Sequence, residues 1–205
     1  MNETTSQAYA GIGSRETPRT ILNLMHQAAR ELRTAGFTLR SGHAEGADSA
    51  FEAGHDSLET TAVPSLKEIY LPWQGFANSN SPLYIPQRNV GAISPEQANK
   101  AYQLASTVHP AWNRMAPKDP ARDPHSPAQR LHARNGFQML GLNLDCPVRF
   151  VLCYTHGGKG EGGTGQALRI AHQHDIPVFD FGTWKEPITR VTAYLRTFLE
   201  IHTRF

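Results

Sequence analysis

Short apolar runs alternate with amphipathic segments along most of the chain. Five of these runs have the composition of β-strands, and they lie at residues 7–13, 37–41, 67–71, 148–155 and 177–181. The run at 148–155 is apolar almost throughout, which is typical of a strand buried on both faces of a parallel sheet. Its cysteine, Cys153, is therefore expected to act as a small buried hydrophobic residue.

The segments between these runs have helical periodicity. In residues 18–34, Met25, Ala29 and Leu32 recur on one helical face, and Gly36 follows as a terminator. The other expected helices span about 47–54, 94–108, 130–140, 164–174 and 185–199. Alternating strands and helices predict an α/β fold, a Rossmann-like three-layer sandwich with a mostly parallel sheet and helices on both faces.

The 205 residues are expected to form a single domain with one insertion. The insertion covers about 72–127, and its second half is crowded with proline. Long connections of this kind are often lids or binding segments, and the alternative is a surface insertion without a role in binding. Its aromatic residues are candidates for stacking on a base, although packing is the simpler role for each: Trp73, Phe76, Tyr84 and Trp112.

Three loops that contain glycine directly follow predicted strands. They start at Gly11, Ser41 and Thr155. The carboxyl ends of parallel strands share one edge of the sheet, so these loops are expected to meet in one crevice there. Glycines let backbone N–H groups approach an anion, and a following helix N-terminus favours negative charge, so a phosphate is the expected ligand group. The expected binding residues are Gly11, Gly13, Ser14, Arg15, Ser41, Gly42, Gly46, Gly162, Gly163, Thr164, Gly165 and Gln166.

Of the three loops, the one at 155–165 indicates an anion-binding site most strongly. It contains six glycines, whereas a structural turn usually needs only one or two residues with positive φ. The alternative is a flexible loop. Thr164 is expected to cap the following helix and to offer its hydroxyl to a phosphate oxygen. The first loop, by contrast, lacks the third glycine of the dinucleotide fingerprint.

Charged residues in and near these loops are candidates for catalysis and binding. Arg15 suits bidentate contact with an anion, or it is a solvated side chain. Glu45 and Asp48 are candidates for a ribose contact or acid–base role, although the helix dipole alone favours an aspartate at position 48. Arg134 lies on a polar stripe of the helix at 130–140, with Arg130 and Gln138. Such a stripe is usually a solvated face, and the alternative is that the preceding proline-rich insertion folds it over the crevice.

Composition narrows the class of protein. The formal net charge of +2 does not by itself indicate a nucleic-acid binder. No apolar run approaches the roughly 18 residues that span a bilayer, and residues 1–7 lack a signal-peptide core, so a cytoplasmic protein without membrane contact is expected. The ten histidines and two cysteines lack metal-site spacing, so neither a metal nor a cofactor is expected.

The order of these motifs resembles the SLOG superfamily of Rossmann-like proteins. The matching stretches are YAGIGSR, SGHAEGADSAFEAG, HARN, and GGTG followed by IPVF, which together cover most of the chain outside 72–127. The superfamily joins the DNA-processing protein A group, which binds single-stranded DNA, to the LOG group of nucleoside-monophosphate phosphoribohydrolases. LHARN is similar to the LOG motif Met-His-x-Arg-Lys, and this resemblance implies a catalytic role for Arg134.

The chain departs from the LOG motif Gly-Gly-x-Gly-Thr-x-x-Glu. Gln166 stands at the threonine position and Arg169 at the glutamate position. Cleavage of an N-glycosidic bond needs a carboxylate, which Glu45, Asp48 or Glu161 would then have to supply. The phosphate-binding part of the motif is retained.

The sequence therefore predicts binding of a nucleotide or nucleotide-derived ligand. Hydrolysis of a nucleoside monophosphate is the expected elaboration, with Arg134, Glu45 and Asp48 as the candidate catalytic residues. The alternatives are a nucleotide sensor or sequestering protein without turnover, and a single-stranded DNA-binding protein like DNA-processing protein A. Relatives in the LOG group usually form dimers, so a homodimer is also expected.

Overall fold

The computed structural model describes residues 7–58, 66–87 and 91–183 and contains one five-stranded sheet. The strands are β1 Ala8–Gly13, β2 Thr38–Ser41, β3 Lys67–Ile69, β4 Val151–Tyr154 and β5 Val178–Asp180. The α-helices in these residues are α1 Arg19–Thr34, α2 Ala47–Asp56, α3 Pro95–Val108, α4 Pro127–Leu140 and α5 Gly162–Gln173. The helix expected over 185–199 lies outside the described residues.

All strand pairs in this sheet are parallel, and the strand order is β3-β2-β1-β4-β5. β1 lies in the centre, where Tyr9 is opposite Leu39 of β2 and Ile12 is opposite Cys153 of β4. The chain builds outward from β1 to β3 and then returns to add β4 and β5 on the other side. The predicted α/β Rossmann-like sandwich is confirmed.

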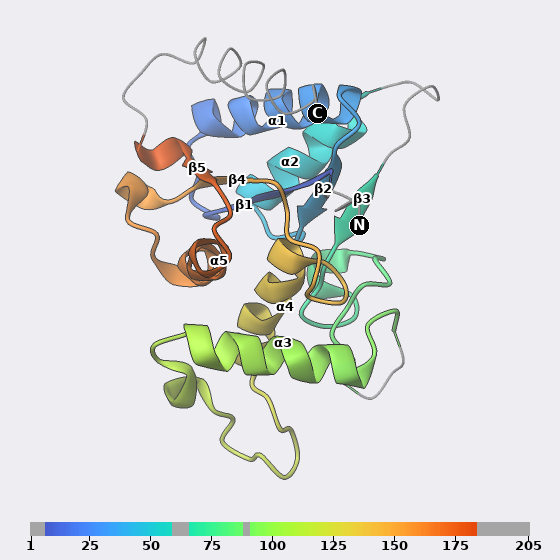
Figure 1. Cartoon of the computed structure of the whole chain (residues 1–205), viewed down its shortest axis with the longest axis vertical. Coiled ribbons are helices and arrows are strands. Elements are labelled where there is room, and N and C mark those ends of the chain that lie inside the picture. Colours follow the sequence, from blue (N-terminus) through green and yellow to red (C-terminus); the bar gives the residue numbers. More distant parts are fainter. Residues whose placement is uncertain (1–6, 59–65, 88–90, 184–205) are drawn as a thin grey trace.

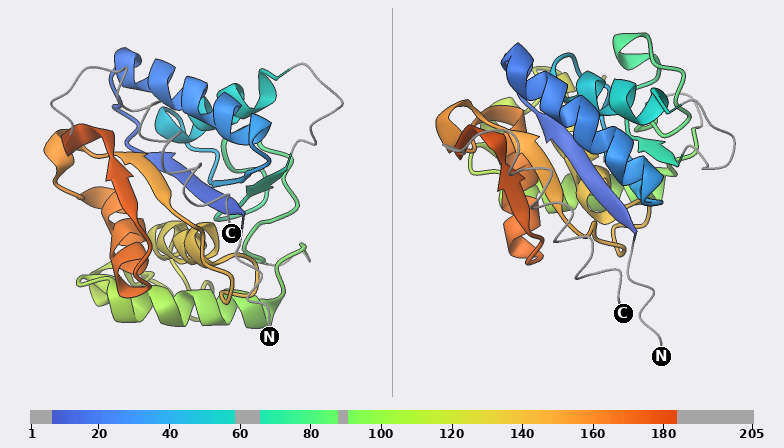
Figure 2. Two further views of the ribbon diagram at one scale, coloured as in Figure 1. Left: turned by 45° about the horizontal axis from the view of Figure 1, so that its top comes forward. Right: turned by 90° about the horizontal axis from the view of Figure 1, so that it is seen from above.

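Helices cover both faces of the sheet. α1 and α2 lie on one face, and α4 and α5 lie on the other (Figure 1). The left view of Figure 2 shows α3 outside α4, so α4 lies between α3 and the sheet. No helix in the described parts of the chain has both the length and the apolar character to cross a membrane.

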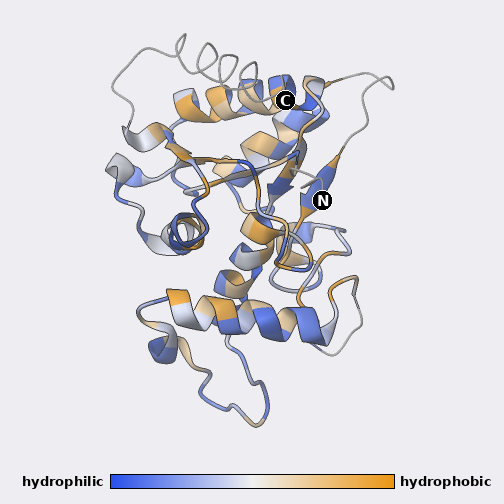
Figure 3. Cartoon of the chain, viewed as in Figure 1, coloured by the Kyte–Doolittle hydropathy of each residue, from blue (hydrophilic) through white to orange (hydrophobic). Residues whose placement is uncertain are grey.

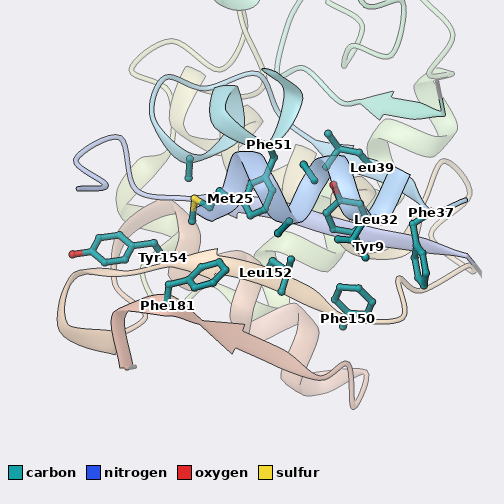
Figure 4. Close-up of a cluster of buried hydrophobic side chains, with 13 residues drawn as sticks. Tyr9, Met25, Leu32, Phe37, Leu39, Phe51, Phe150, Leu152, Tyr154 and Phe181 are labelled. Carbon is teal, nitrogen blue, oxygen red and sulfur yellow. The ribbon is translucent and has the colours of Figure 1, made fainter. Parts of the chain in front are cut away.

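The side chains of β1 alternate between the two cores. Tyr9 belongs to the cluster beneath α1 and α2, whereas Ala8, Ala10 and Ile12 belong to the cluster beneath α4 and α5. Figure 4 shows the first cluster, in which the Tyr9 and Phe150 rings stack with centroids 5.8 Å apart. A strand buried on both faces has no solvated side, which explains the apolar character of β1 and β4.

α1 follows the predicted pattern closely. Met25, Ala29 and Leu32 are fully buried against the sheet, and the helix ends at Ala35, after which Gly36 has a φ of +82°. A left-handed residue after the last turn is the usual way for a helix to end, and glycine adopts it without strain. The predicted helix and its terminator are confirmed.

The insertion is a packed part of the domain rather than only loop. α3 confirms the helix expected at 94–108, and its residues Ala101 and Tyr102 pack with Phe137 of α4. The rest of the insertion contains two short 3-10 turns, at Phe76–Asn78 and Trp112–Met115.

Two matching capping boxes start α3 and α4. Ser94 accepts a hydrogen bond from the backbone N–H of Gln97, whose side chain accepts one from the Ser94 N–H. Ser126 and Gln129 repeat the arrangement. Because this cap fixes the start of the helix, α4 begins at Pro127, earlier than expected.

Some strands are shorter than expected. β3 ends at Ile69 and β4 spans Val151–Tyr154, although Val148 and Phe150 just before β4 are also buried. Apolar character reports burial rather than ladder pairing, which is why the predicted strand of 148–155 was too long.

Candidate functional site

A cavity of about 560 Å³ opens at the carboxyl edge of the sheet. Its lining includes Ser14 and Arg15 after β1, Asp48 after β2, and Thr155 and Gly163 after β4. The three glycine-containing loops therefore meet in one crevice. The cavity lies beside the point between β1 and β4 where the strand order reverses, which is where open α/β sheets bind their ligands.

The N-terminus of α5 forms one wall of this cavity through Gly162, Gly163 and Thr164. Glu161 occupies the N-cap position, but no side chain caps the helix and no acidic residue lies in its first turn. The prediction that Thr164 caps the helix is wrong, because α5 begins two residues earlier, at Gly162. The first-turn N–H groups therefore have no intrahelical partner and carry partial positive charge.

Most glycines of this loop have a conformational reason to be glycine. The φ angles of Gly157, Gly158, Gly160 and Gly162 are +61°, +69°, +60° and +66°, so the expectation that the turn needs only one or two such residues is wrong. Gly163 is different. It lacks a positive φ, and a Cβ added there would meet no atom within 4 Å. Its missing side chain leaves the cavity wall open beside the helix N-terminus.

The polar stripe of α4 is buried at the crevice rather than solvated. Arg130, Arg134 and Gln138 are only 6%, 8% and 1% exposed. Arg134 and Gln138 line the cavity, together with Asn135, whose side-chain amide donates to the carbonyl of Gly163 at 3.0 Å. Arg134 and Gln138 pack against Gly42, just after β2, where an added Cβ would lie within 2.7 Å of both side chains, so this part of the stripe is enclosed at the edge of the sheet.

Arg134 and Asp48 form the charged centre of the cavity. Nη1 of Arg134 donates to the carbonyl of Gly42 at 2.7 Å and lies 3.9 Å from Oδ2 of Asp48. Burial raises the pKa of Asp48 to about 6, although Arg134 and the backbone N–H of Ala44 act in the opposite direction. Burial also lowers the pKa of the Arg134 guanidinium; Asp48 opposes this shift and Arg15 adds to it.

Arg15 and Ser14 differ in what they offer a ligand. Arg15 is exposed at the cavity wall and is close enough to Arg134 to act on its pKa. The backbone N–H of Ser14 already donates to the Tyr154 carbonyl at 3.0 Å, and its Oγ accepts from the N–H of Glu16 at 3.1 Å. The structure thus leaves Arg15 the more accessible donor of the two.

Several predicted binding residues lie behind the cavity wall. A Cβ on Gly11 would lie 2.6 Å from the Phe51 ring, so this glycine lets α2 pack closely on β1. Ser41 is buried, and its hydroxyl donates to the Gly11 carbonyl at 2.7 Å. Gly42 is also buried, and its carbonyl accepts from Arg134. These residues shape the site without being part of its lining.

Four further candidates also lie outside the lining. Gly46 precedes α2 with a φ of +84°, and its Cβ would lie 2.7 Å from the Ser14 and Arg15 carbonyl oxygens. Gly165 packs against the Gly160 carbonyl, and fully buried Gln166 donates to the Ala105 carbonyl at 3.4 Å. Glu45 is exposed and is not part of the lining, so Asp48 is the better placed of the two carboxylates.

The aromatic residues of the insertion lie outside the lining. Tyr84 is buried, and Trp112 packs against the cluster formed by α3 and α4. Phe76 packs edge-on against Trp73, with centroids 5.2 Å apart, and its ring centroid lies 6.0 Å from the guanidinium carbon of Arg134. The insertion therefore contacts the site through Arg134.

The cavity also contains residues that sequence reasoning missed. His132, Asn135 and Gln138 come from α4, and Thr155 follows β4. The stripe that includes Gln138 is visible in the sequence, but its burial depends on the close approach of α4 to Gly42 after β2. Asp180 of β5 accepts hydrogen bonds from both the backbone and the hydroxyl of Thr155, an anchor that no sequence spacing indicates.

Comparisons of this chain with protein-family models, with curated proteins and with solved structures gave no match. Within residues 7–58, 66–87 and 91–183, no group of three or more His, Cys, Asp or Glu side chains is placed to hold a metal ion. The chemistry of the site is therefore argued from its own residues.

Proposed function

We propose that this chain binds a nucleotide or nucleotide-derived ligand in the cavity between β1 and β4. The ligand's phosphate lies at the N-terminus of α5, against the first-turn N–H groups of Gly162, Gly163 and Thr164. Arg15 and Arg134 provide compensating positive charge. The proposal agrees with the resemblance of the sequence motifs to the SLOG superfamily.

The observation that carries this proposal is the uncapped N-terminus of α5 opening into a cavity that also contains two arginines. Uncapped N–H groups and a helix dipole favour an anion, and guanidinium groups suit phosphate oxygens. The volume of about 560 Å³ is within the range of small-ligand pockets, which supports a mononucleotide-sized ligand over a nucleic-acid strand.

A thermal-shift screen tests the proposal. Nucleoside monophosphates, cyclic nucleotides and ADP-ribose derivatives are added to the full chain, and a ligand of the native state raises Tm with increasing concentration. Short oligonucleotides form a separate arm. Tighter binding of oligonucleotides than of mononucleotides, with a steep loss of affinity in salt, would favour the DNA-binding alternative.

The variant Gly163→Ala separates ligand binding from stability. Alanine raises helix propensity, so we expect the free protein to gain up to about 1 kcal/mol of stability. The added methyl group enters the cavity, so nucleotide affinity falls. Ser106→Ala on the exposed side of α3 is the control, because it also raises helix propensity but leaves the cavity unchanged. Unchanged nucleotide affinity in Gly163→Ala would contradict the proposed phosphate position.

Hydrolysis of an N-glycosidic bond is a second candidate, favoured by the position of Asp48. Its carboxyl lines the cavity beside Arg134 with a pKa of about 6, so it is mainly ionised at neutral pH and available to the sugar or to a water molecule. Chromatography of nucleoside monophosphates after incubation would detect free base, and Asp48→Asn would abolish its release. Absence of free base from every substrate would leave binding without turnover.

A further inference from the structure

Asn135 joins two walls of the cavity through its side-chain amide. Its Oδ1 accepts a hydrogen bond from Nε of Arg134 at 3.2 Å, and its Nδ2 donates to the carbonyl of Gly163 at 3.0 Å. Arg134 in turn donates through Nη1 to the Gly42 carbonyl at 2.7 Å. A continuous chain of hydrogen bonds therefore runs from the loop after β2, across α4, to the first turn of α5.

An asparagine suits this position because the side chain must accept on one side and donate on the other. A guanidinium can only donate and a backbone carbonyl can only accept, so the two partners fix which end of the amide faces each of them. Asn135 and Arg134 are only 4% and 8% exposed, which protects both bonds from exchange with water. An aspartate would lose the donor, and an apolar side chain of the same size would lose both bonds.

These bonds also determine which nitrogen of Arg134 is left for a ligand. Nε donates to Asn135 and Nη1 donates to Gly42, whereas Nη2 makes no hydrogen bond within the part of the chain that the structure describes and keeps accessible surface. Arg134 belongs to the cavity lining. Because two of its nitrogens are held, the plane of the guanidinium is fixed before a ligand arrives.

The bond to Gly163 acts on the other anion-binding element. The Gly163 carbonyl and the Thr164 N–H belong to one peptide group, and a hydrogen bond to the carbonyl polarises that group and strengthens its N–H as a donor. Thr164 lies in the first turn of α5 and lines the cavity. Asn135 is therefore bonded both to the arginine and to a peptide group of the helix N-terminus.

We propose that Asn135 is a positioning residue that makes Arg134 and the N-terminus of α5 act together on one phosphate group. The inference rests on the proposed function. It adds that the arginine and the helix N-terminus are not independent. Loss of the Asn135 amide should weaken phosphate binding although both binding groups are still present, because ordering of the guanidinium then has to occur during binding.

Titration calorimetry of the full chain with adenosine, guanosine, cytidine and uridine monophosphates and with ADP-ribose tests the inference. Asn135→Leu keeps the approximate size of the side chain but makes neither hydrogen bond. Its affinity for the probe that the wild type binds most tightly should fall about tenfold, because preorganisation of Arg134 and polarisation of the Thr164 N–H are both lost. A structural role alone would lower Tm and leave the affinity of the folded protein unchanged.

A double-mutant cycle separates positioning from direct contact with the ligand. Arg134→Lys keeps a positive charge beside Asp48 but has no Nε–H for Asn135 to hold. In that background Asn135→Leu should lower affinity by no more than about threefold, because only the bond to Gly163 remains to be lost. An equal loss in both backgrounds would overturn the positioning role.

Asn23→Leu is the matched control, because Asn23 is exposed on α1, on the opposite face of the sheet. It should bind like the wild type. If Asn135→Leu does not fold, Asn135→Asp takes its place. The aspartate has the same shape and still accepts from Arg134, but it cannot donate to Gly163 and its charge opposes a phosphate, so affinity should again fall about tenfold.

The outcomes distinguish this inference from the proposed function. Wild-type affinity in a folded Asn135 variant would overturn the role of Asn135 while leaving nucleotide binding intact. Failure of the wild type to bind any of the probes would overturn the proposed function and this inference with it.

Discussion

α1 and α4 both bury apolar side chains in the cores of the domain, but α4 also buries a polar face. The face of α1 carries Met25 and Leu32, whereas α4 buries Arg134 and Gln138 beside the cavity. Both helices carry hydrophobic and hydrophilic residues in Figure 3, so overall hydropathy does not separate them. Burial of the apolar face stabilises the fold, whereas a buried polar face costs free energy unless it is paired. The comparison indicates that both helices stabilise the fold through their apolar side chains, whereas α4 in addition lines the cavity.

The largest expected effect on stability is in α1. Leu32→Ala removes a fully buried side chain and leaves a cavity, so the free energy of unfolding should fall by about 2–5 kcal/mol. Urea denaturation measures this loss. Nucleotide affinity of the folded fraction should stay at the wild-type value. A loss below about 1 kcal/mol would contradict the assignment of α1 as a major source of stability.

The corresponding change in α4 should act on binding instead. The double variant Arg134→Met with Asp48→Asn removes both members of the buried charge pair, and such replacements are often neutral for stability. We expect the free energy of unfolding to change by no more than about 1 kcal/mol, whereas nucleotide affinity falls about 100-fold. Titration calorimetry and urea denaturation give the two values. A double variant that binds like the wild type would remove the distinction between the helices.

The pH dependence of stability sharpens the same comparison. Burial raises the pKa of Asp48 from 3.8 to about 6, so the folded state binds this proton more tightly than the unfolded state does. Relative to Asp48→Asn, the wild type should therefore gain about 3 kcal/mol as the pH falls from 8 to below 4. This contribution of Asp48 to the free energy of unfolding is lost again as the pH rises through 6.

Two histidines act in the opposite direction. Burial lowers the pKa of His55 and His132 to about 4. Protonation of either histidine therefore favours the unfolded state, and each lowers the free energy of unfolding as the pH falls from 6.5 through 4. Both residues remain in Asp48→Asn, so their effects cancel in the difference between the two proteins. Parallel pH profiles of wild type and variant would contradict the raised pKa of Asp48.

The smallest expected effects come from the paired helix caps. Ser94→Ala and Ser126→Ala each remove one capping box and should each lower the free energy of unfolding by about 1 kcal/mol. Only Ser126→Ala should also weaken nucleotide binding, because Ala128 and Leu131 in the first turns of α4 line the cavity. Equal affinity in the two variants would show that the start of α4 does not position the site.

The elements of the fold could be predicted because their signals are local. Periodicity in α1 and the apolar run of β1 report which side chains are buried, and both predicted elements are confirmed. The start of α4 was also predictable, since Ser126-Pro127-Ala128-Gln129 is a capping-box sequence that repeats the pattern at Ser94.

The depth of the site could not be predicted from local signals. The stripe with Arg134 and Gln138 has the spacing of a solvated face, but the chain after β2 covers it: Arg134 donates to the Gly42 carbonyl, and a Cβ on Gly42 would lie 2.7 Å from Nε2 of Gln138. The same limit applies to Glu45 and Asp48, which lie three positions apart. The start of α2 turns one outward and the other into the cavity.

The parallel pairing of β1 with β4 also bears on the order of assembly. Ala10 pairs with Val151, so this central ladder joins two segments separated by β2, β3 and the whole insertion. Contacts between such distant segments are slow to form, because a long loop must close first. The cavity has walls on both sides of this ladder, so it does not exist in a fragment that ends before β4. A nucleotide analogue whose fluorescence changes on binding would therefore report completion of the sheet during refolding.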